Sequence, residues 1–316
     1  MLVSIIIPTY NRATFLKETI ISAQQQEYSN IEILVIDNAS VDNTEELVRG
    51  LMISDPRIFY YKQSENKRAA KARNIGVQLS KGNYVQFLDS DDLLYPDKIK
   101  KQVDLINIDS GLDFVLCQSE LFGDQTGVWN KIPQNGEQDL ILKHLKGLIS
   151  WGVESPLWKK SFLINMGGFY ENLSASEEYE YHVRALTFFP NIKIIEESLV
   201  KVRIHQDEPS VRRSFSNKHQ RISSFYADVY IWENLKSKSL IDCEIQKSLK
   251  ERFKNIYFHS VYEENFILTR KVLFFTFFNT SSLRSKFSIF FLGTPAFFIT
   301  YFTNRNKNFL ISILNK

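Results

Sequence analysis

The first part of the chain alternates between short apolar runs and longer segments whose apolar residues recur every three or four positions. The runs are rich in β-branched residues and predict buried strands at 2–7, 31–36, 57–62, 84–88 and 113–117. The longer segments predict helices at 13–26, 44–52, 67–79 and 96–108. Strands and helices that alternate at this spacing predict an α/β fold on a parallel sheet with right-handed crossovers.

Polar residues directly follow three of the predicted strands. The three segments are Pro8-Thr9-Tyr10-Asn11-Arg12, Asp37-Asn38-Ala39-Ser40 and Asp89-Ser90-Asp91-Asp92. Because ligands of such sheets bind beyond the carboxyl ends of the strands, we expect these segments to meet in one crevice. The third segment carries three carboxylates within four residues, and a divalent cation would offset their repulsion. A second interpretation is that Asp91 or Asp92 caps a helix that begins near Pro96.

Composition narrows the classes of function. There is no GxGxxG after the first strand and no GxxxxGK[ST], which disfavours a dinucleotide oxidoreductase and a P-loop NTPase. The net charge of +3 argues against a nucleic-acid-binding protein. Cys117 and Cys243 lie too far apart to suggest a disulfide framework or a zinc site. The first apolar run is too short for a signal peptide and lacks a basic segment, so we expect a cytoplasmic protein.

Four stretches of the sequence resemble those of one known family. In order, they read VSIIIPTYNR, ILVIDNASVDNT, KARNIGVQLSKGNYVQFLDSDD and GGFYENLSASEEYEYHVRAL. Over roughly residues 2 to 210 the chain is similar to the family-2 glycosyltransferases, which have the GT-A fold, a mostly parallel Rossmann-like sheet with flanking helices. The resemblance implies a catalytic domain at 1–213, with a nucleotide-sugar half at about 1–117 and an acceptor half at about 118–213. A helical C-terminal region would follow at 214–316.

The resemblance implies a binding site for the nucleotide of a nucleotide sugar. The residues that match it are Pro8, Thr9, Asn11, Arg12, Asp37, Arg73, Asp89 and Ser90. Asp37 would accept a hydrogen bond from a uracil N–H, although the same residue also suits an Asx-turn that closes the loop to Ser40. Arg73, in a motif that reads ARN, would lie near the diphosphate, and its alternative is a solvated cation on a surface helix.

The resemblance also implies a metal site. Asp89 and Asp91 match the DxD motif of the family, in which the aspartates bind Mn²⁺ or Mg²⁺ on the diphosphate. His205 stands in an R-x-H segment that resembles the end of the family's catalytic domain, and it is a further candidate ligand of the metal. The metal would act as a Lewis acid and neutralise charge on the departing nucleoside diphosphate.

The candidate general base follows a Gly-Gly-Phe turn. The family has an Asp at this position, and this chain has Glu178, preceded by Glu177. Glutamate is one methylene longer than aspartate, so Glu177, Glu178 or Glu180 could accept the proton, and Glu178 is the favoured candidate. The alternative is an acidic helix start that suits the helix dipole.

The segment between the two halves of the predicted catalytic domain is less regular. A hairpin at 118–129 and a helix at 137–146 are expected there. Trp151 and Trp158 lie in a part that resembles the acceptor side of the family fold, where they would stack on sugar rings. The alternative for both is packing in the core.

The C-terminal third is predicted to be helical at 215–238 and 242–266, with an aromatic, basic tail at about 271–316. That tail has six Lys or Arg, no Asp or Glu and eleven of the 25 phenylalanines. Its apolar pieces are too short to span a bilayer. It is typical of a helix in the membrane interface, on the inner face of the cell membrane. A buried helix pair or a contact between subunits of a homo-oligomer is the alternative.

The function expected from these features is that of an inverting, metal-assisted glycosyltransferase, hexosyl or N-acetylhexosaminyl. It would move a sugar from a nucleotide sugar, with UDP favoured, to a hydroxyl of a cell-surface polysaccharide or lipid-linked glycan precursor. Three alternatives stay open. They are a non-catalytic nucleotide-sugar-binding module, a membrane scaffold subunit of a glycan-assembly complex, and a nucleotidyltransferase.

Overall fold

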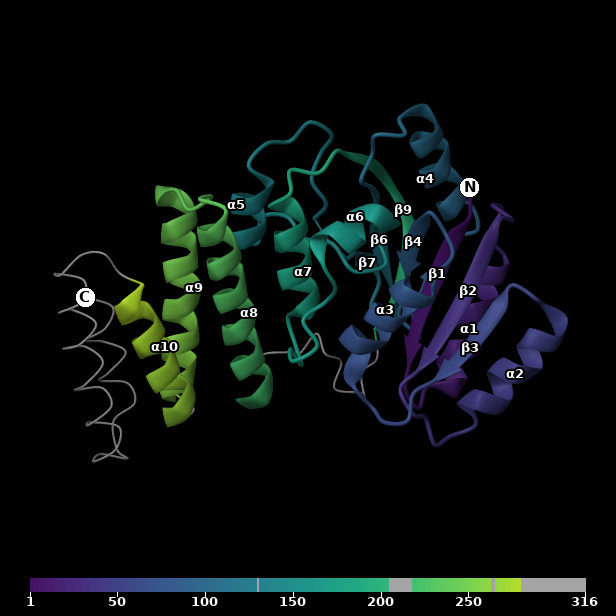
Figure 1. The fold of residues 1–316 in the computed structure, drawn as a ribbon, viewed down its shortest axis with the longest axis horizontal. Coiled ribbons are helices and arrows are strands. Elements are labelled where there is room, and N and C mark those ends of the chain that lie inside the picture. Colours follow the sequence, from purple (N-terminus) through teal and green to yellow (C-terminus); the bar gives the residue numbers. More distant parts are fainter. Residues whose placement is uncertain (130, 205–217, 263–264, 280–316) are drawn as a thin grey trace. The chain divides into compact units, whose positions relative to one another are not determined.

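The computed structural model describes residues 1–129, 131–204, 218–262 and 265–279 (Figure 1). The chain divides into two compact units, Met1–Arg213 and Ser214–Lys316. Strands and helices make up the first unit, and helices make up the described part of the second.

The first unit alternates strands with helices along most of its length. Its strands are β1 (Val3–Thr9), β2 (Ile31–Asp37), β3 (Ile58–Lys62), β4 (Tyr84–Phe87), β5 (Leu93–Leu94), β6 (Phe114–Gly123), β7 (Gly127–Val128), β8 (Leu157–Lys159) and β9 (Ile192–Ile204). Its helices are α1 (Ala13–Gln24), α2 (Thr44–Ser54), α3 (Arg68–Leu79), α4 (Lys98–Ile108), α5 (Leu140–Leu145), α6 (Lys160–Met166) and α7 (Glu177–Leu186).

The described strands join in one mixed sheet, in the order β3-β2-β1-β4-β8-β6-β9-β5, with β7 paired to β6. β1 lies between β2 and β4 and is parallel to both. β8 is antiparallel to β4 and to β6, whereas β6 and β9 are parallel. This mixed α/β sheet with flanking helices confirms the expected GT-A type of fold.

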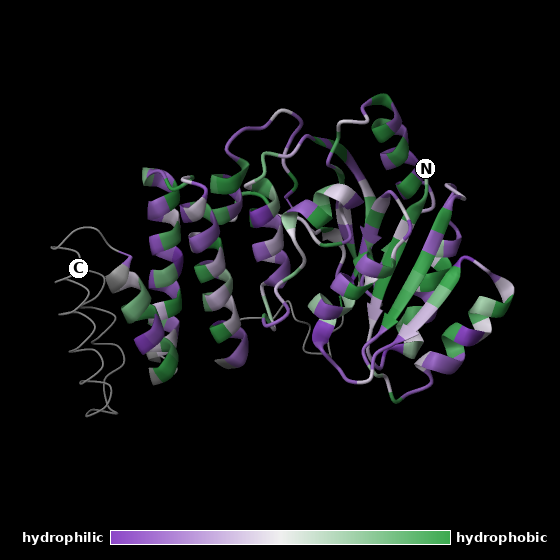
Figure 2. Cartoon of the chain, viewed as in Figure 1, coloured by the Kyte–Doolittle hydropathy of each residue, from purple (hydrophilic) through white to green (hydrophobic). Residues whose placement is uncertain are grey.

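Helices cover both faces of the sheet, and each face has its own apolar core. On one face α1, α2 and α4 pack with residues such as Leu16, Val48 and Ile99. On the other face α3, α6 and α7 pack with residues such as Ala72 and Phe162. The central strands β1 and β2 are buried along their whole length, as their continuous apolar runs predict, and Figure 2 shows them as the most hydrophobic part of the sheet.

Two glycines in helices offer a test of how closely helix and sheet pack. A Cβ on Gly76 of α3 would lie 2.3 Å from Cγ2 of the buried Ile6 on β1, whereas a Cβ on Gly50 of α2 would meet nothing within 4 Å. Gly76→Ala should therefore destabilise the protein by about 1–3 kcal/mol through overpacking. Gly50→Ala, the matched control, should stabilise it by about 0.5–1 kcal/mol because it restricts the unfolded chain. Urea unfolding measures both, and equal effects of the two substitutions would contradict the packing.

The second unit contains α8 (Lys218–Ser237), α9 (Cys243–Tyr262) and α10 (Phe266–Phe278). The first two helices confirm the helical pattern seen in the sequence. Aromatic rings of Phe225, Trp232, Phe253 and Phe275 pack together between the three helices. α10 covers the start of the aromatic tail, and the remainder of the tail, residues 280–316, lies outside the described residues. None of the described helices has the length and hydropathy needed to cross a membrane.

Candidate active site

A buried arginine connects the end of β4 to the start of α7. Arg73 of α3 is only 2% exposed, and its Nη2 donates to Asp89 Oδ1 at 2.7 Å and to Glu178 Oε1 at 3.2 Å. Its Nη1 lies 3.7 Å from Glu177 Oε1. Burial alone would lower the pKa of Arg73, but the three carboxylates raise it above the usual value, so the side chain is a permanent cation. The structure thus brings together residues that are about 100 positions apart in the sequence.

The two glutamates start α7 on a strained turn. Ser176, the residue before the helix, has a φ of 62°, in the left-handed region that non-glycine residues rarely adopt. Glu178 keeps 32% of its side-chain surface open to solvent, whereas Glu177 keeps 14%. Backbone strain of this kind concentrates at functional sites. Glu178 is the more accessible of the two carboxylates that Arg73 holds in place.

The carboxyl group of Glu178 is a weaker acid than a free glutamate, because its pKa is raised. The surrounding protein desolvates it, and this effect outweighs the opposing charge of Arg73; the negative charges of Asp89, Glu177 and Glu154 add to it. Together they raise the pKa of Glu178 to about 8. A carboxylate with a pKa near neutrality and access to solvent is suited to accept a proton.

Glu180 is not placed to accept a proton. It is fully buried, and Arg184 binds both of its oxygens through Nε at 2.8 Å and Nη2 at 3.0 Å. The same guanidinium donates to the carbonyl oxygens of Met166, Gly167 and Gly168. The ion pair therefore holds the Gly-Gly-Phe turn against α7, which removes Glu180 from the three candidates for the base.

Asn74 holds the other side of the Gly-Gly-Phe turn. Its Oδ1 accepts from the Phe169 N–H at 2.8 Å, and its Nδ2 donates to the Phe169 carbonyl at 3.0 Å. A Cβ on Gly168 would lie 2.5 Å from Asn74 Oδ1, so the glycine permits this close approach. The ring of Phe169 stacks on Tyr181 and faces the Arg73 guanidinium. Asn74, which follows Arg73 in the ARN motif, therefore fixes the turn.

The ends of β1 and β2 are joined by hydrogen bonds. The Asn11 N–H donates to Ser40 Oγ at 2.9 Å, and Asn11 Oδ1 accepts from the Val41 N–H at 2.9 Å. Arg12 continues toward the third segment, where its Nη1 lies 3.6 Å from Asp91 Oδ2. The three polar strand ends therefore meet, as expected from a parallel sheet.

Asp37 makes the Asx-turn that the sequence allowed. Its Oδ1 accepts from the Ser40 N–H at 2.8 Å and from Ser40 Oγ at 2.6 Å, while Tyr60 donates its hydroxyl to Oδ2. The side chain is fully buried. Its contact with a nucleotide base stays a prediction. Of the other predicted nucleotide contacts, Pro8 and Thr9 are buried at the end of β1 and Ser90 is half-buried.

Asp92 does not cap a helix. It is buried, its Oδ1 accepts from the Arg203 N–H of β9 at 2.8 Å, and its carbonyl accepts from Thr19 Oγ1 of α1 at 2.9 Å. The next helix, α4, begins at Lys98 after Asp97. The capping interpretation of this segment was therefore wrong, because Asp92 fastens the loop after β4 to β9 and α1. Asp91 stays accessible beside it.

This arrangement can be compared with known proteins. Residues 4–165 match the family model for Glycosyl transferase family 2. The chain belongs to glycosyl transferase family 2. It is 33% identical to an uncharacterized glycosyltransferase of Rickettsia conorii over 74% of this chain and 40% of the relative. It is 28% identical to one of Methanocaldococcus jannaschii over 74% of this chain and 81% of the relative. The chain spans about 40% of the length of the first relatives it matches.

Solved structures share the fold of this family member. S. aureus TarS 1-349 in complex with UDP-GlcNAc matches with a TM-score of 0.57 and 17% identity, over 82% of this chain and 81% of that chain. The mannosyltransferase PcManGT from Pyrobaculum calidifontis, in complex with GDP-Man and Mn²⁺, matches with a TM-score of 0.57 and 16% identity, over 99% and 84%. At these identities the likeness concerns the fold alone.

The carboxylates of this family-2 site can be tested as metal ligands. The described residues contain no cluster of three or more His, Cys, Asp or Glu side chains arranged to hold a metal ion, and His205 lies outside them. Asp89 and Asp91 nevertheless offer hard oxygen donors, and each keeps part of its side chain exposed. One or two carboxylates, completed by substrate phosphates, are a usual arrangement for Mg²⁺. The two aspartates therefore fit a cation that arrives with a diphosphate.

The two tryptophans predicted to stack on an acceptor lie in the core. Trp151 and Trp158 are both buried. Trp158 packs against Phe114 and Phe162, and Trp151 packs against His182. Their ring faces are covered by protein, so the structure contradicts the stacking role and supports the alternative of core packing.

Glu154 is a residue of the site that the sequence did not reveal. It is buried in the loop between α5 and β8, and its negative charge contributes to the raised pKa of Glu178. A Cβ on Gly152 would lie 2.1 Å from Glu154 Oε1, so this carboxylate occupies space that only a glycine leaves open. The sequence offered only the spacing of Gly152 and Glu154 as a signal. That spacing does not by itself indicate a buried carboxylate near the site.

Proposed function

We propose that this chain is an inverting glycosyltransferase that moves a sugar from a nucleotide sugar to an acceptor hydroxyl. The observation that carries the proposal is the contact of Arg73 with Asp89, Glu178 and Glu177. One cation thereby links the predicted diphosphate side of the site to the predicted base. Capping or solvation would not require a buried guanidinium between three carboxylates.

Each side chain has a chemical role in this proposal. Asp89 and Asp91 would hold Mn²⁺ or Mg²⁺, which supplies Lewis-acid stabilisation of the departing diphosphate when it is bound. Arg12, whose Nη1 lies 3.6 Å from Asp91 Oδ2, would bind a phosphate oxygen. Arg73, which donates to Glu178, would orient this carboxylate toward the acceptor. Glu177, the less exposed neighbour, contributes to the charge that raises the pKa of Glu178.

The reaction follows from the position of Glu178. Its carboxylate accepts the proton of the acceptor hydroxyl, and the resulting oxygen attacks the anomeric carbon. The bond from that carbon to the diphosphate breaks, and the nucleoside diphosphate leaves with the electron pair. One direct displacement inverts the anomeric configuration, as in inverting glycosidases.

We also propose the chemical classes of the donor and of the acceptor. A UDP-sugar is the favoured donor, and the fold neighbours in complex with UDP-GlcNAc and with GDP-Man make both nucleotides worth testing. The acceptor is proposed to be a polysaccharide or lipid-linked glycan precursor. A basic, aromatic tail that binds a membrane surface would suit such an acceptor.

A donor panel tests the proposal. Nucleotide release is measured from UDP-, GDP- and dTDP-sugars with Mn²⁺, with Mg²⁺ and with EDTA. We expect metal-dependent release from one donor, and its loss in Asp91→Asn. Binding of a donor without release, in mixtures that include lipid-linked acceptors, would favour a non-catalytic binding module. Failure to bind any nucleotide sugar would overturn the proposal.

The pKa of Glu178 predicts the pH dependence of turnover. The ionised carboxylate is the active form of a general base, so the rate rises as pH rises through the pKa. With a pKa of about 8, kcat/KM should increase by about tenfold per pH unit at lower pH and level off above that value. A pH profile of nucleotide release from pH 6 to 9.5 measures this. A profile that is flat, or that falls with pH over this range, would contradict Glu178 as the base.

A further inference from the structure

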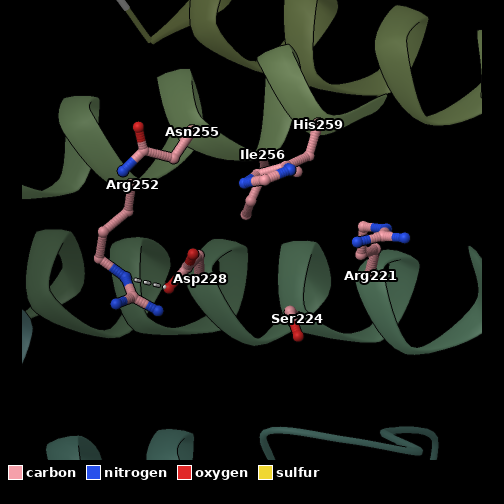
Figure 3. Close-up of a pocket in the computed structure, with 7 residues that line it drawn as sticks. All are labelled: Arg221, Ser224, Asp228, Arg252, Asn255, Ile256 and His259. Atoms are coloured by element: carbon pink, nitrogen blue, oxygen red, sulfur yellow. Dashed lines mark hydrogen bonds and ion pairs between the residues drawn. The ribbon is translucent and has the colours of Figure 1, made fainter. Parts of the chain in front are cut away.

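The second unit contains a pocket of its own between two helices. It has a volume of about 250 Å³, and its lining residues are Arg221, Ser224, Asp228, Arg252, Asn255, Ile256 and His259 (Figure 3). The first three lie on α8 at positions i, i+3 and i+7, and the last four lie on α9 at i, i+3, i+4 and i+7. Both sets follow one helix face. Among the described residues, the lining of the pocket belongs to α8 and α9.

The two ends of the pocket differ in chemistry. Arg221 lies at one end and the Arg252–Asp228 pair at the other, as Figure 3 shows. Arg221 and Asp228 are seven positions apart on α8, which corresponds to about 10 Å along the helix axis. The same interval on α9 places His259 toward the Arg221 end. One end is therefore cationic, and the other combines a guanidinium with a carboxylate.

The cationic end suits an anion. Arg221 is buried, and burial lowers the pKa of its guanidinium, which means that its charge is poorly solvated in the folded protein. An anion in the pocket would lie beside this positive charge. Guanidinium groups bind phosphate oxygens through two parallel hydrogen bonds.

The other end suits a hydroxyl group. Arg252 Nε donates to Asp228 Oδ1 at 2.8 Å, which fixes the carboxylate. Asp228 is fully buried, and among the described residues its second oxygen, Oδ2, has no hydrogen-bond partner. A buried carboxylate oxygen without a donor is costly. A ligand hydroxyl could donate to Oδ2 while it accepts from a guanidinium N–H, as vicinal hydroxyls of sugars do.

We infer that this pocket binds a sugar or polyol phosphate, with the phosphate at Arg221 and His259 and the hydroxyl groups at Asp228 and Arg252. The two guanidinium groups outnumber the one carboxylate of the lining, so the pocket favours an anionic over a neutral sugar. The length between the ends accommodates a monosaccharide that carries one phosphate. Ser224 and Asn255 supply further polar groups along the walls.

Calorimetry with the full chain tests the inference. Glucose 1-phosphate is the probe, and inorganic phosphate and glucose are the two half-ligands. Glucose 1-phosphate should bind more tightly than either half. Arg221→Gln and Asp228→Asn should each lower the affinity for glucose 1-phosphate by about tenfold or more. Arg270→Gln removes an exposed arginine of α10 outside the pocket and should leave binding unchanged.

A second set of measurements keeps the test decisive. Thermal unfolding shows whether each variant is folded, and His259→Gln alters an exposed lining residue that the fold does not require. The His259→Gln substitution should weaken the binding of glucose 1-phosphate without lowering the Tm of the protein. Absence of binding to the wild-type chain at millimolar probe would overturn the inference. Binding that survives in Arg221→Gln and His259→Gln would also overturn it, because the ligand would then occupy another site, such as the nucleotide-sugar site.

Discussion

Replacing Glu178 by Gln is expected to lower kcat for sugar transfer by a factor of about 10²–10⁴, the usual contribution of a general base. The amide has nearly the same shape but cannot accept the proton. Donor affinity should change little, since Glu178 is proposed to act on the acceptor. Steady-state kinetics give kcat, and calorimetry with the donor and Mn²⁺ gives the affinity.

The same substitution has a predictable effect on stability. Because the folded state raises the pKa of Glu178, ionisation of this residue is less favourable in the folded than in the unfolded protein. The cost appears as pH rises through the folded pKa. Glu178→Gln should therefore unfold at the same or a higher temperature than wild type at pH 9. A variant that is inactive because it is unfolded would show the opposite.

Two neighbouring substitutions make the assignment specific. Glu177→Gln should reduce kcat less than Glu178→Gln, because Glu177 is less exposed and acts through charge. Glu46→Gln, on an exposed position of α2, is the matched control and should be neutral. If Glu177→Gln abolishes turnover while Glu178→Gln keeps it, the base is Glu177.

Arg73→Met is expected to lose both activity and stability. It removes the cation that contacts Asp89, Glu178 and Glu177 and leaves three carboxylates close together. Breaking a fully buried ion pair costs about 3–5 kcal/mol. Asp89 and Glu178 each keep about a third of their side-chain surface exposed, so a loss of about 2–4 kcal/mol is expected here.

The pH dependence of that loss separates charge from packing. Glu178, whose pKa is raised to about 8, is ionised at pH 9 and protonated at pH 4.5. The stability difference between wild type and Arg73→Met should therefore be larger at pH 9 than at pH 4.5 when it is measured by urea unfolding. Arg49→Met, at an exposed arginine of α2, is the control and should cost little at either pH. An equal loss at both pH values would mean that the charge of Glu178 contributes nothing to the loss.

The parts of the site that local sequence specifies were predictable. Continuous apolar runs identified β1, β2 and β4, and the rule for parallel sheets placed the segments after them together. The contacts of Asn11 with Ser40 and of Arg12 with Asp91 confirm that these strand ends meet. The resemblance to the family singled out Arg73 and Glu178, which the fold brings within hydrogen-bond distance.

Contacts between distant parts of the chain were not predictable. The i, i+4 spacing of Glu180 and Arg184 permits an ion pair, but its burial depends on the contacts of Arg184 with the carbonyl oxygens of residues 166–168. The burial of Trp151 and Trp158 depends on how α6 and α7 pack on the sheet. β8 has only three residues, and β9 pairs with β6 through irregularities at Gln118 that interrupt the alternation of a regular strand. Such features depend on tertiary contacts.

The anomeric configuration of the first product tests the central claim most directly. With enzyme in excess, slow hydrolysis of the donor or transfer to an acceptor is followed by proton NMR before the sugar mutarotates. A single displacement assisted by Glu178 predicts a product whose anomeric configuration is opposite to that of the donor. Retention of the donor's configuration would contradict direct displacement and, with it, the role assigned to Glu178.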